Sequence, residues 1–101
     1  MAQFDVYINP NRENADLFPY FVDIQNNFHD TIKTRVVIPL TTEMKAFTRL
    51  TPIFTIGGQK LTLSIAEIAS IPLSVCGKKV DNLEAHSSEI FDALDFLVHG
   101  F

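Results

Sequence analysis

IFTIGGQKLTL, residues 53–63, is the stretch that decides the fold. Two short runs of alternating apolar and polar residues lie on either side of Gly57-Gly58. A two-residue hairpin turn needs a positive φ at both central positions, and glycine adopts it without steric cost. The stretch therefore predicts two antiparallel strands joined by a tight turn.

The period of two recurs before and after this hairpin. Apolar residues occupy every second position in three earlier segments: Phe4, Val6 and Ile8; Tyr20, Val22 and Ile24; and Val36, Ile38 and Leu40. This spacing is typical of half-buried strands, with residues such as Asp5 and Tyr7 on the other face. A further strand is predicted at Ile71, Leu73 and Val75. It is expected at an edge or a bulge, because Pro72 has no N–H to donate.

The last segment changes to a helical period. Its apolar residues form one stripe of an amphipathic helix: Ile90, Phe91, Leu94, Leu97 and Val98. Asp81 and Glu84 resemble a capping box at its start, and Gly100 fits a helix end. The irregular stretch 41–51 has room for a short helical turn at 43–47. The residues alone thus predict an α+β fold that is mostly β, with one C-terminal helix.

The opposite face of this helix is acidic. It carries Glu89, Asp92 and Asp95, and the helix contains no Lys or Arg. The face is either simply solvated or a surface for a basic partner. The chain then ends in His99-Gly100-Phe101, which is either a helix end folded back on the core or a short recognition tip.

Composition narrows the functional classes. The chain has 101 residues, 47% of them hydrophobic, which suits a single domain (1–101) with a packed core. Its formal net charge is −4, and its basic residues are scattered, which argues against direct binding of nucleic acid. No apolar run approaches the ~20 residues that span a bilayer. No signal-peptide pattern opens the chain, so we expect a cytoplasmic protein.

Few residues are arranged for chemistry. His29, His86 and His99 show no metal-ligand spacing, so neither a metal nor another cofactor is expected. Cys76 ends an apolar strand pattern and is expected to be a buried, inert thiol. Arg35 and Arg49 are expected as surface residues or salt-bridge partners. The residues alone therefore predict a small acidic domain that is not an enzyme.

Three blocks of sequence, taken in order, resemble a known family. They are Gln3-Phe4-x-Val6-Tyr7; FVDIQ (21–25) with VIPL (37–40); and ASIPLSV (69–75), followed by Gly100 as the penultimate residue. Together they resemble the CcdB family, the toxins of plasmid and chromosomal toxin–antitoxin pairs that poison bacterial DNA gyrase. The resemblance covers nearly the whole chain.

The resemblance implies a fold and a mode of action. Family members are homodimers with an SH3-like antiparallel β-barrel sheet, a small second sheet and a long C-terminal helix. They bind the A subunit of DNA gyrase and trap the enzyme with cleaved DNA, which serves plasmid maintenance. They catalyse nothing themselves, and a CcdA-like antitoxin neutralises them.

The resemblance also implies gyrase-contacting residues. Gly100 matches the penultimate Gly of the family, and Phe101 stands where Ile is typical. His99 stands where the best-known members carry Trp, which is the main departure. The remaining contact positions are occupied by Val98, Asp95 and Phe28. In the family these positions carry a Phe, an Asn and an apolar residue, respectively.

Alternatives remain for the site and for the function. Gly100 could serve only as a helix stop, Phe101 could pack on the sheet, and Phe28 could be a loop anchor. The MazF-type endoribonuclease toxins share the SH3-like fold, so RNA cleavage is a second functional class. A third is a CcdB-like protein that no longer poisons gyrase, suggested by His99 and by a loop at 41–49 shorter than in well-known members.

Overall fold

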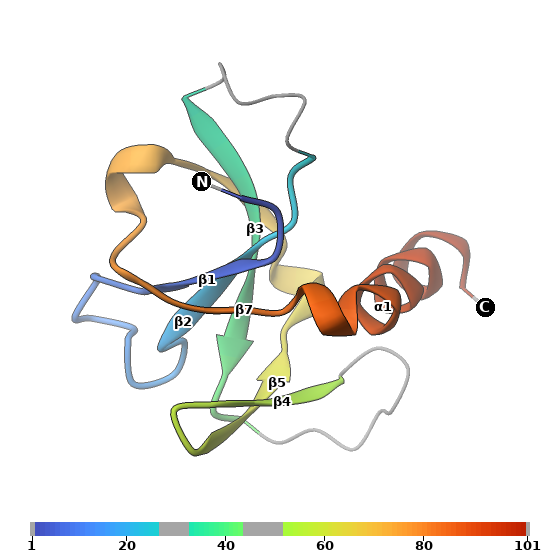
Figure 1. Cartoon of the computed structure of the whole chain (residues 1–101), viewed down its shortest axis with the longest axis horizontal. Coiled ribbons are helices and arrows are strands. Elements are labelled where there is room, and N and C mark those ends of the chain that lie inside the picture. Colours follow the sequence, from blue (N-terminus) through green and yellow to red (C-terminus); the bar gives the residue numbers. More distant parts are fainter. Residues whose placement is uncertain (1, 27–32, 44–51, 101) are drawn as a thin grey trace.

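The computed structural model describes residues 2–26, 33–43 and 52–100 (Figure 1). Two of the predicted contact residues, Phe28 and Phe101, lie outside these residues, as does most of the helical turn predicted at 43–47. The strands are β1 (Asp5–Ile8), β2 (Tyr20–Asp23), β3 (Thr34–Thr41), β4 (Ile53–Ile56), β5 (Gln59–Leu63), β6 (Ala69–Pro72) and β7 (Lys79–Asn82). Three short 3₁₀ turns lie between these elements: η2 (Ile65–Glu67) before β6, η3 (Leu73–Val75) after it and η4 (Glu84–His86) after β7. The helix α1 (Ser87–His99) is the last element.

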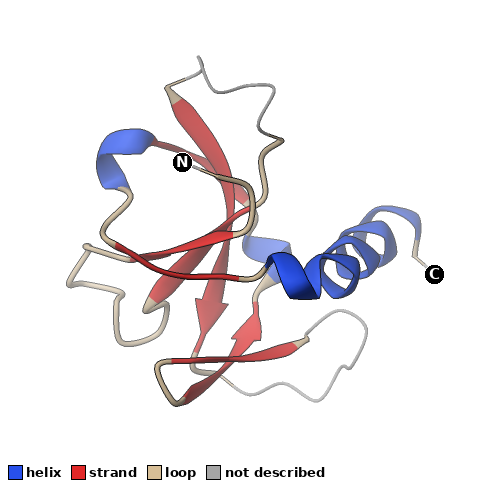
Figure 2. Ribbon diagram, in the orientation of Figure 1, coloured by secondary structure: helices blue, strands red, loops and turns tan. Residues whose placement is uncertain are grey.

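The strands form one curled antiparallel sheet with α1 against one end, as the colours of Figure 2 make plain. The order is β4-β5-β3-β2-β1-β7, and β6 branches off by pairing with β3. β3 is long enough to pair with β6 through Thr34–Val37 and with β5 through Leu40 and Thr41. The mostly β, α+β fold is confirmed, and the smaller sheet implied by the resemblance is continuous with the main one through β3.

The hairpin predicted from residues 53–63 is confirmed. Gly57 and Gly58 have φ values of 57° and 82°, the left-handed pair that a tight hairpin turn requires. Ile56 pairs with Gln59 and Phe54 with Leu61 on either side of the turn. The predicted alternation therefore places one face of this hairpin in the core.

The core lies between the concave face of the sheet and α1. Its fully buried members are Val6, Val22, Ile38, Leu40, Leu61, Leu63, Ile90 and Ala93. Val22 and Ile38 are paired across β2 and β3, and Val22 also pairs with Val6 of β1. The apolar residues that recur at every second position therefore form the inward face of three neighbouring strands, β1, β2 and β3.

The prediction that β1 is half-buried is wrong. Asp5 and Tyr7 are 3% and 5% exposed, whereas Ile8 is 38% exposed. Hydrogen bonds make the burial of Asp5 possible: its carboxylate accepts from the Tyr7 hydroxyl, the Asn82 amide and the Ala2 N–H. A polar residue in a strand is thus no guide to the exposed face when hydrogen-bond donors satisfy it inside the fold.

The strand predicted at 71–75 is correct only in its first part. β6 ends at Pro72, and the chain turns into η3, where the Cys76 N–H donates to the Leu73 carbonyl at 3.1 Å. Pairing ends because Pro72 lies opposite Thr34, the first residue of β3. The predicted edge position is confirmed within the described chain, where β6 pairs with β3 alone.

The capping box predicted at Asp81 and Glu84 is wrong. Asp81 lies in β7, a strand that the apolar pattern does not reveal, and α1 begins only at Ser87. The side chain of Asn82 supplies a hydrogen bond there instead, because its oxygen accepts the Glu84 N–H at 2.8 Å at the start of η4. The predicted helix end is confirmed: Gly100 has φ 76° and its N–H donates to the Phe96 carbonyl at 2.8 Å.

Candidate functional site

The first half of α1 fixes the helix to the sheet. Ile90 and Ala93 are fully buried against the core, and Leu94 is partly buried. On the neighbouring side the rings of Phe4 and Phe91 pack edge to face, with centroids 5.4 Å apart. The last turn lies beyond these contacts, at the far end from the β1–β2 connection, and points away from the sheet (Figure 1).

The last turn of α1 is exposed. Val98 is 73% exposed, and His99 and Gly100 are exposed beside it. Of the predicted apolar stripe, Phe91 and Leu97 are also 43% and 41% exposed. The stripe is therefore correct as a helical period, but only its first part is buried against the core, and Leu97 and Val98 present apolar surface in the last turn.

An acidic side chain lies next to this surface. Asp95 is exposed three residues before Val98 and four before His99, spacings at which helix side chains are neighbours, so Asp95 lies at the border between the acidic face and the apolar stripe. The structure thus brings together Asp95, Val98, His99 and Gly100 of the predicted site. We call these four residues the C-terminal tip. Phe28 and Phe101 stay predictions, because they lie outside the described residues.

A buried ion pair joins β2 and β3, a few residues before the described part of the chain stops at Asn26. Arg35 Nε donates to Asp23 Oδ2 at 2.8 Å, and Arg35 Nη2 donates to Asp23 Oδ1 at 3.1 Å. The side chains of Arg35 and Asp23 are 2% and 0% exposed. Of the two roles expected for Arg35, the salt-bridge partner is correct. The sequence does not predict that this salt bridge is buried. Residues 12 apart meet only through the register of β2 against β3, which no local pattern in the sequence indicates.

Ionisable side chains near this pair are held in their neutral forms. Burial raises the pKa of the half-buried Cys76 thiol, an effect reinforced by Asp23 and opposed by Arg35. Burial, then the hydrogen bond to Asp5, raises the pKa of Tyr7 well above its ordinary value. A protonated thiol is a poor nucleophile, in keeping with the inert Cys76 predicted, whereas the predicted full burial of Cys76 is wrong. Among the described residues no group of three or more His, Cys, Asp or Glu side chains could hold a metal ion.

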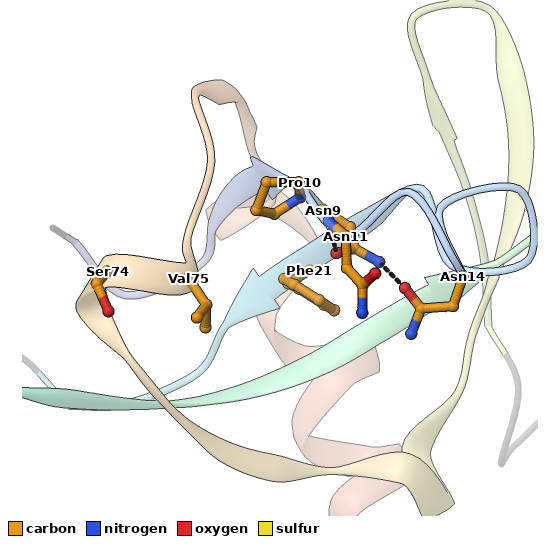
Figure 3. Close-up of a pocket in the computed structure, with 7 residues that line it drawn as sticks. All are labelled: Asn9, Pro10, Asn11, Asn14, Phe21, Ser74 and Val75. Carbon is orange, nitrogen blue, oxygen red and sulfur yellow. Dashed lines mark hydrogen bonds between the residues drawn. The ribbon is translucent and has the colours of Figure 1, made fainter.

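A pocket of about 460 Å³ lies on the outer face of the sheet (Figure 3). Phe21 of β2 lies between the β1–β2 connection and η3, and the lining comprises Asn9, Pro10, Asn11, Asn14, Phe21, Ser74 and Val75. The Asn9 side chain donates to Asn14 and to the Phe18 carbonyl, both at 2.8 Å, so its amide fixes the loop. The lining has no charged side chain and none of the predicted site residues.

Comparison with solved structures supports the fold. A chain described as an endoribonuclease in complex with its cognate antitoxin, from Mycobacterial species, aligns with a TM-score of 0.76 and 16% sequence identity. The alignment covers 97% of this chain and 94% of that one. At this identity the likeness shows a shared fold.

No helix in the described part of the chain is long and apolar enough to cross a membrane.

Comparison with family models identifies the chain's relatives. The model of the CcdB protein family matches residues 3–100, which includes all three sequence blocks, the C-terminal tip and Phe28. With this match over nearly its whole length, the chain belongs to the CcdB family and is a toxin of a type II toxin–antitoxin system.

Proposed function

We propose that this toxin acts on DNA gyrase, by binding the A subunit and trapping the complex of gyrase with cleaved DNA. Membership of the CcdB family carries this proposal. The exposure of the C-terminal tip supports it, because a helix end that the fold leaves open can enter a partner's surface. The proposed contacts are Asp95, Val98, His99, Gly100, Phe101 and Phe28.

Each tip residue offers a distinct contact to gyrase. Val98 gives apolar area, and the His99 ring gives a face on which an Arg guanidinium can stack. The Asp95 carboxylate can pair with the same kind of basic group. Gly100 ends α1 in the left-handed conformation, which glycine adopts without steric cost.

The toxin in this proposal is a binding protein and not an enzyme. RNA cleavage is the second candidate, because the structural neighbour is an endoribonuclease. Phosphoryl chemistry needs a cationic group that can reach a phosphate. The guanidinium of Arg35 is instead buried against Asp23, which favours the gyrase proposal over RNA cleavage by this residue.

Two partners besides gyrase belong to the proposal. Phe91 in the middle of α1 and Leu97 in its last turn are partly exposed and support a homodimer, since exposed apolar surface often marks a site of protein–protein contact. A CcdA-like antitoxin neutralises the toxin, and the structural neighbour was itself solved with its cognate antitoxin. We place this interplay in the bacterial cytoplasm, where gyrase acts.

A calorimetric titration with a fragment of the gyrase A subunit tests the proposal. We expect the wild-type chain to bind, and a variant lacking residues 100–101 to lose binding while it keeps its circular dichroism spectrum and melting temperature. Asp95→Ala should weaken binding, whereas Asp92→Ala, which removes another exposed acid about one turn earlier, should not. Binding that survives the truncation in a folded protein would reject the tip as the contact surface.

Two further assays separate the alternatives. Purified gyrase with supercoiled DNA should accumulate cleaved DNA in the presence of the toxin. Incubation of the pure toxin with RNA should leave the RNA intact. RNA cleavage with gyrase unaffected would favour the endoribonuclease, and antitoxin binding without gyrase binding would indicate a CcdB-like protein that no longer poisons gyrase.

A further inference from the structure

The helix α1 is held by the rest of the fold on two sides. Ile90 and Ala93 are fully buried in the core and hold the helix along one line. Phe91 lies on the flank of this line, about 100° around the helix from Ile90, and its ring packs edge to face on the ring of Phe4. Contacts along a single line leave a helix free to roll about that line. The contact on the flank is therefore the one that fixes the roll of α1.

The same contact fixes the direction of the C-terminal tip. Asp95 and Val98 follow Phe91 by four and seven residues, spacings that place side chains one above another on a helix. Val98 lies about 10 Å beyond Phe91 along the helix axis. A tilt of α1 by about 10° would move Val98 by about 2 Å, whereas the residues of a binding site must be held to within about 0.5 Å. The support of α1 at Phe91 therefore decides where the tip lies.

Phe4 has a backbone conformation that is unfavourable for its large side chain. Its φ is 71°, in the left-handed region that bulky residues rarely adopt. Two hydrogen bonds hold it there. The Phe4 N–H donates to the Asp23 carbonyl at the end of β2, and the Phe4 carbonyl accepts the Leu83 N–H just before η4. Strained residues persist only where the surrounding structure fixes them, and they cluster at functional sites.

Stability accounts for only part of this arrangement. Phe91 remains 43% exposed in its contact with Phe4, so much of its ring stays in solvent. A glycine would adopt the left-handed conformation at position 4 without strain, but it would offer no ring to Phe91. The feature peculiar to Phe4 is therefore the ring that it presents to α1.

We infer that Phe4 and Phe91 are positioning residues for gyrase recognition, which fix the direction of α1 and so place the C-terminal tip for its partner. This inference rests on the proposed function. Phe4 is 5% exposed and too deeply buried to touch a partner, so it acts through the ring of Phe91. A helix that already has its bound direction gives up less conformational freedom on binding, which favours affinity.

Phe4→Leu tests the inference. The variant keeps an apolar side chain in the core and loses the edge-to-face contact. We expect its affinity for the gyrase A fragment, measured by calorimetric titration, to fall about two- to tenfold, the range that one aromatic pair can supply. Residual dipolar couplings of the α1 amides, measured by NMR relative to those of the sheet, should also change, because they report the direction of the helix.

Phe21→Leu is the matched control. It makes the same replacement in β2 but on the outer face of the sheet, where Phe21 lines the pocket of Figure 3. Any loss of stability that it causes should leave gyrase affinity and the couplings of α1 unchanged.

Phe91→Leu and the double variant complete the design. Phe91 is partly exposed, so Phe91→Leu should fold even if Phe4→Leu does not, and the couplings of its α1 amides then serve as the test. In a double-mutant cycle, the double variant should lose no more gyrase affinity than the weaker-binding single variant, because both changes remove one contact. Losses that multiply would show that Phe4 does not act through Phe91 and would overturn the inference.

The outcomes are separable. If the wild-type chain does not bind the gyrase fragment, the proposed function fails and the positioning role fails with it. If the wild type binds and a folded Phe4→Leu variant binds equally well, only the positioning inference is overturned. Reduced affinity with unchanged couplings also overturns it, because the helix then keeps its direction. Reduced affinity with changed couplings, and neither change in Phe21→Leu, supports it.

Discussion

The ring of Phe4 packs edge to face on the ring of Phe91, with centroids 5.4 Å apart and ring planes inclined at 70°. Phe4 is 5% exposed and has a φ of 71°, an unusual conformation for a bulky residue. Its carbonyl accepts the Leu83 N–H at 2.8 Å. Phe4, the residue just before β1, therefore connects the start of the chain to the helix that carries the C-terminal tip.

Truncation of this pair should destabilise the fold. Phe4→Ala removes a buried ring, and we expect the free energy of unfolding to fall by about 3–5 kcal/mol. Phe91→Ala should cost less, because Phe91 is 43% exposed. A double-mutant cycle from urea unfolding should give a coupling of about 0.5–1.5 kcal/mol between the rings. Strictly additive effects would show that the contact contributes nothing beyond burial.

Gly77 lies where no side chain fits. A Cβ built there would stand 2.3 Å from the carbonyl oxygen of Ile8 and 3.1 Å from its carbonyl carbon. Backbone must shift to relieve this overlap, so Gly77→Ala should lower the free energy of unfolding by about 1–3 kcal/mol. Ser74→Ala, which removes only a hydroxyl from the exposed η3, should change urea unfolding little. An unchanged Gly77→Ala variant would contradict this close approach of the chains.

Gly100 meets no such crowding, so its requirement is conformational. Nothing lies within 4 Å of a Cβ built there, but its φ is 76°. Gly100→Ala should cost about 1–2 kcal/mol in this left-handed conformation. Gly100→Asn should cost less, because asparagine adopts it more readily. Gyrase titrations should rank the wild type above Asn and Asn above Ala. Equal affinities would show that the turn at Gly100 is not needed for binding.

Asp5 should make stability depend on acid pH. Burial by itself raises the pKa of Asp5, but hydrogen bonds from Asn82, Ala2, Lys79 and Tyr7 outweigh it and hold the pKa below its ordinary value of 3.8. The carboxylate therefore stabilises the fold above pH 3.8, and this contribution is lost as the pH falls through the lower pKa of the folded state.

Thermal unfolding of the wild type and Asp5→Asn between pH 2 and 6 measures this contribution, over a range that includes the ordinary pKa of Asp, 3.8. The difference in melting temperature between the two proteins should be largest at pH 6 and should shrink toward pH 2. A constant difference across the range would contradict the lowered pKa of Asp5.

His99→Trp tests the main departure from the family pattern. Indole offers a larger face than imidazole for stacking on an Arg guanidinium, so binding to the gyrase A fragment should become more favourable by about 0.5–2 kcal/mol. His99→Ala should weaken binding. The same affinity for all three residues would show that position 99 does not contact gyrase.

Local signals in the sequence predicted much of the fold. Gly57-Gly58 specified the hairpin, and Gly100 specified the end of α1, because each needs a backbone conformation that glycine favours. β7 escaped prediction because its four residues are all exposed and include one apolar side chain, Val80. It is recognised only by its pairing with β1, which no local pattern encodes.

The candidate site was predictable to a similar degree. The exposed end of α1 follows from the helical period and the position of Gly100. The burial of the ion pair between Asp23 and Arg35 does not, because it depends on the register of β2 against β3 and on two charges meeting inside the protein. Contacts between distant residues are set by tertiary structure and leave no periodic trace in the sequence.

The central place of β3 has a consequence for synthesis on the ribosome. β2 precedes it and pairs with one of its sides, whereas β5 and β6 follow it and pair with the other. A growing chain that has reached Thr41 still lacks two of these three partners, and non-local strand pairing is slow to form. The sheet is complete only after β7 has emerged and paired with β1, so the toxin can finish folding only late in its own translation.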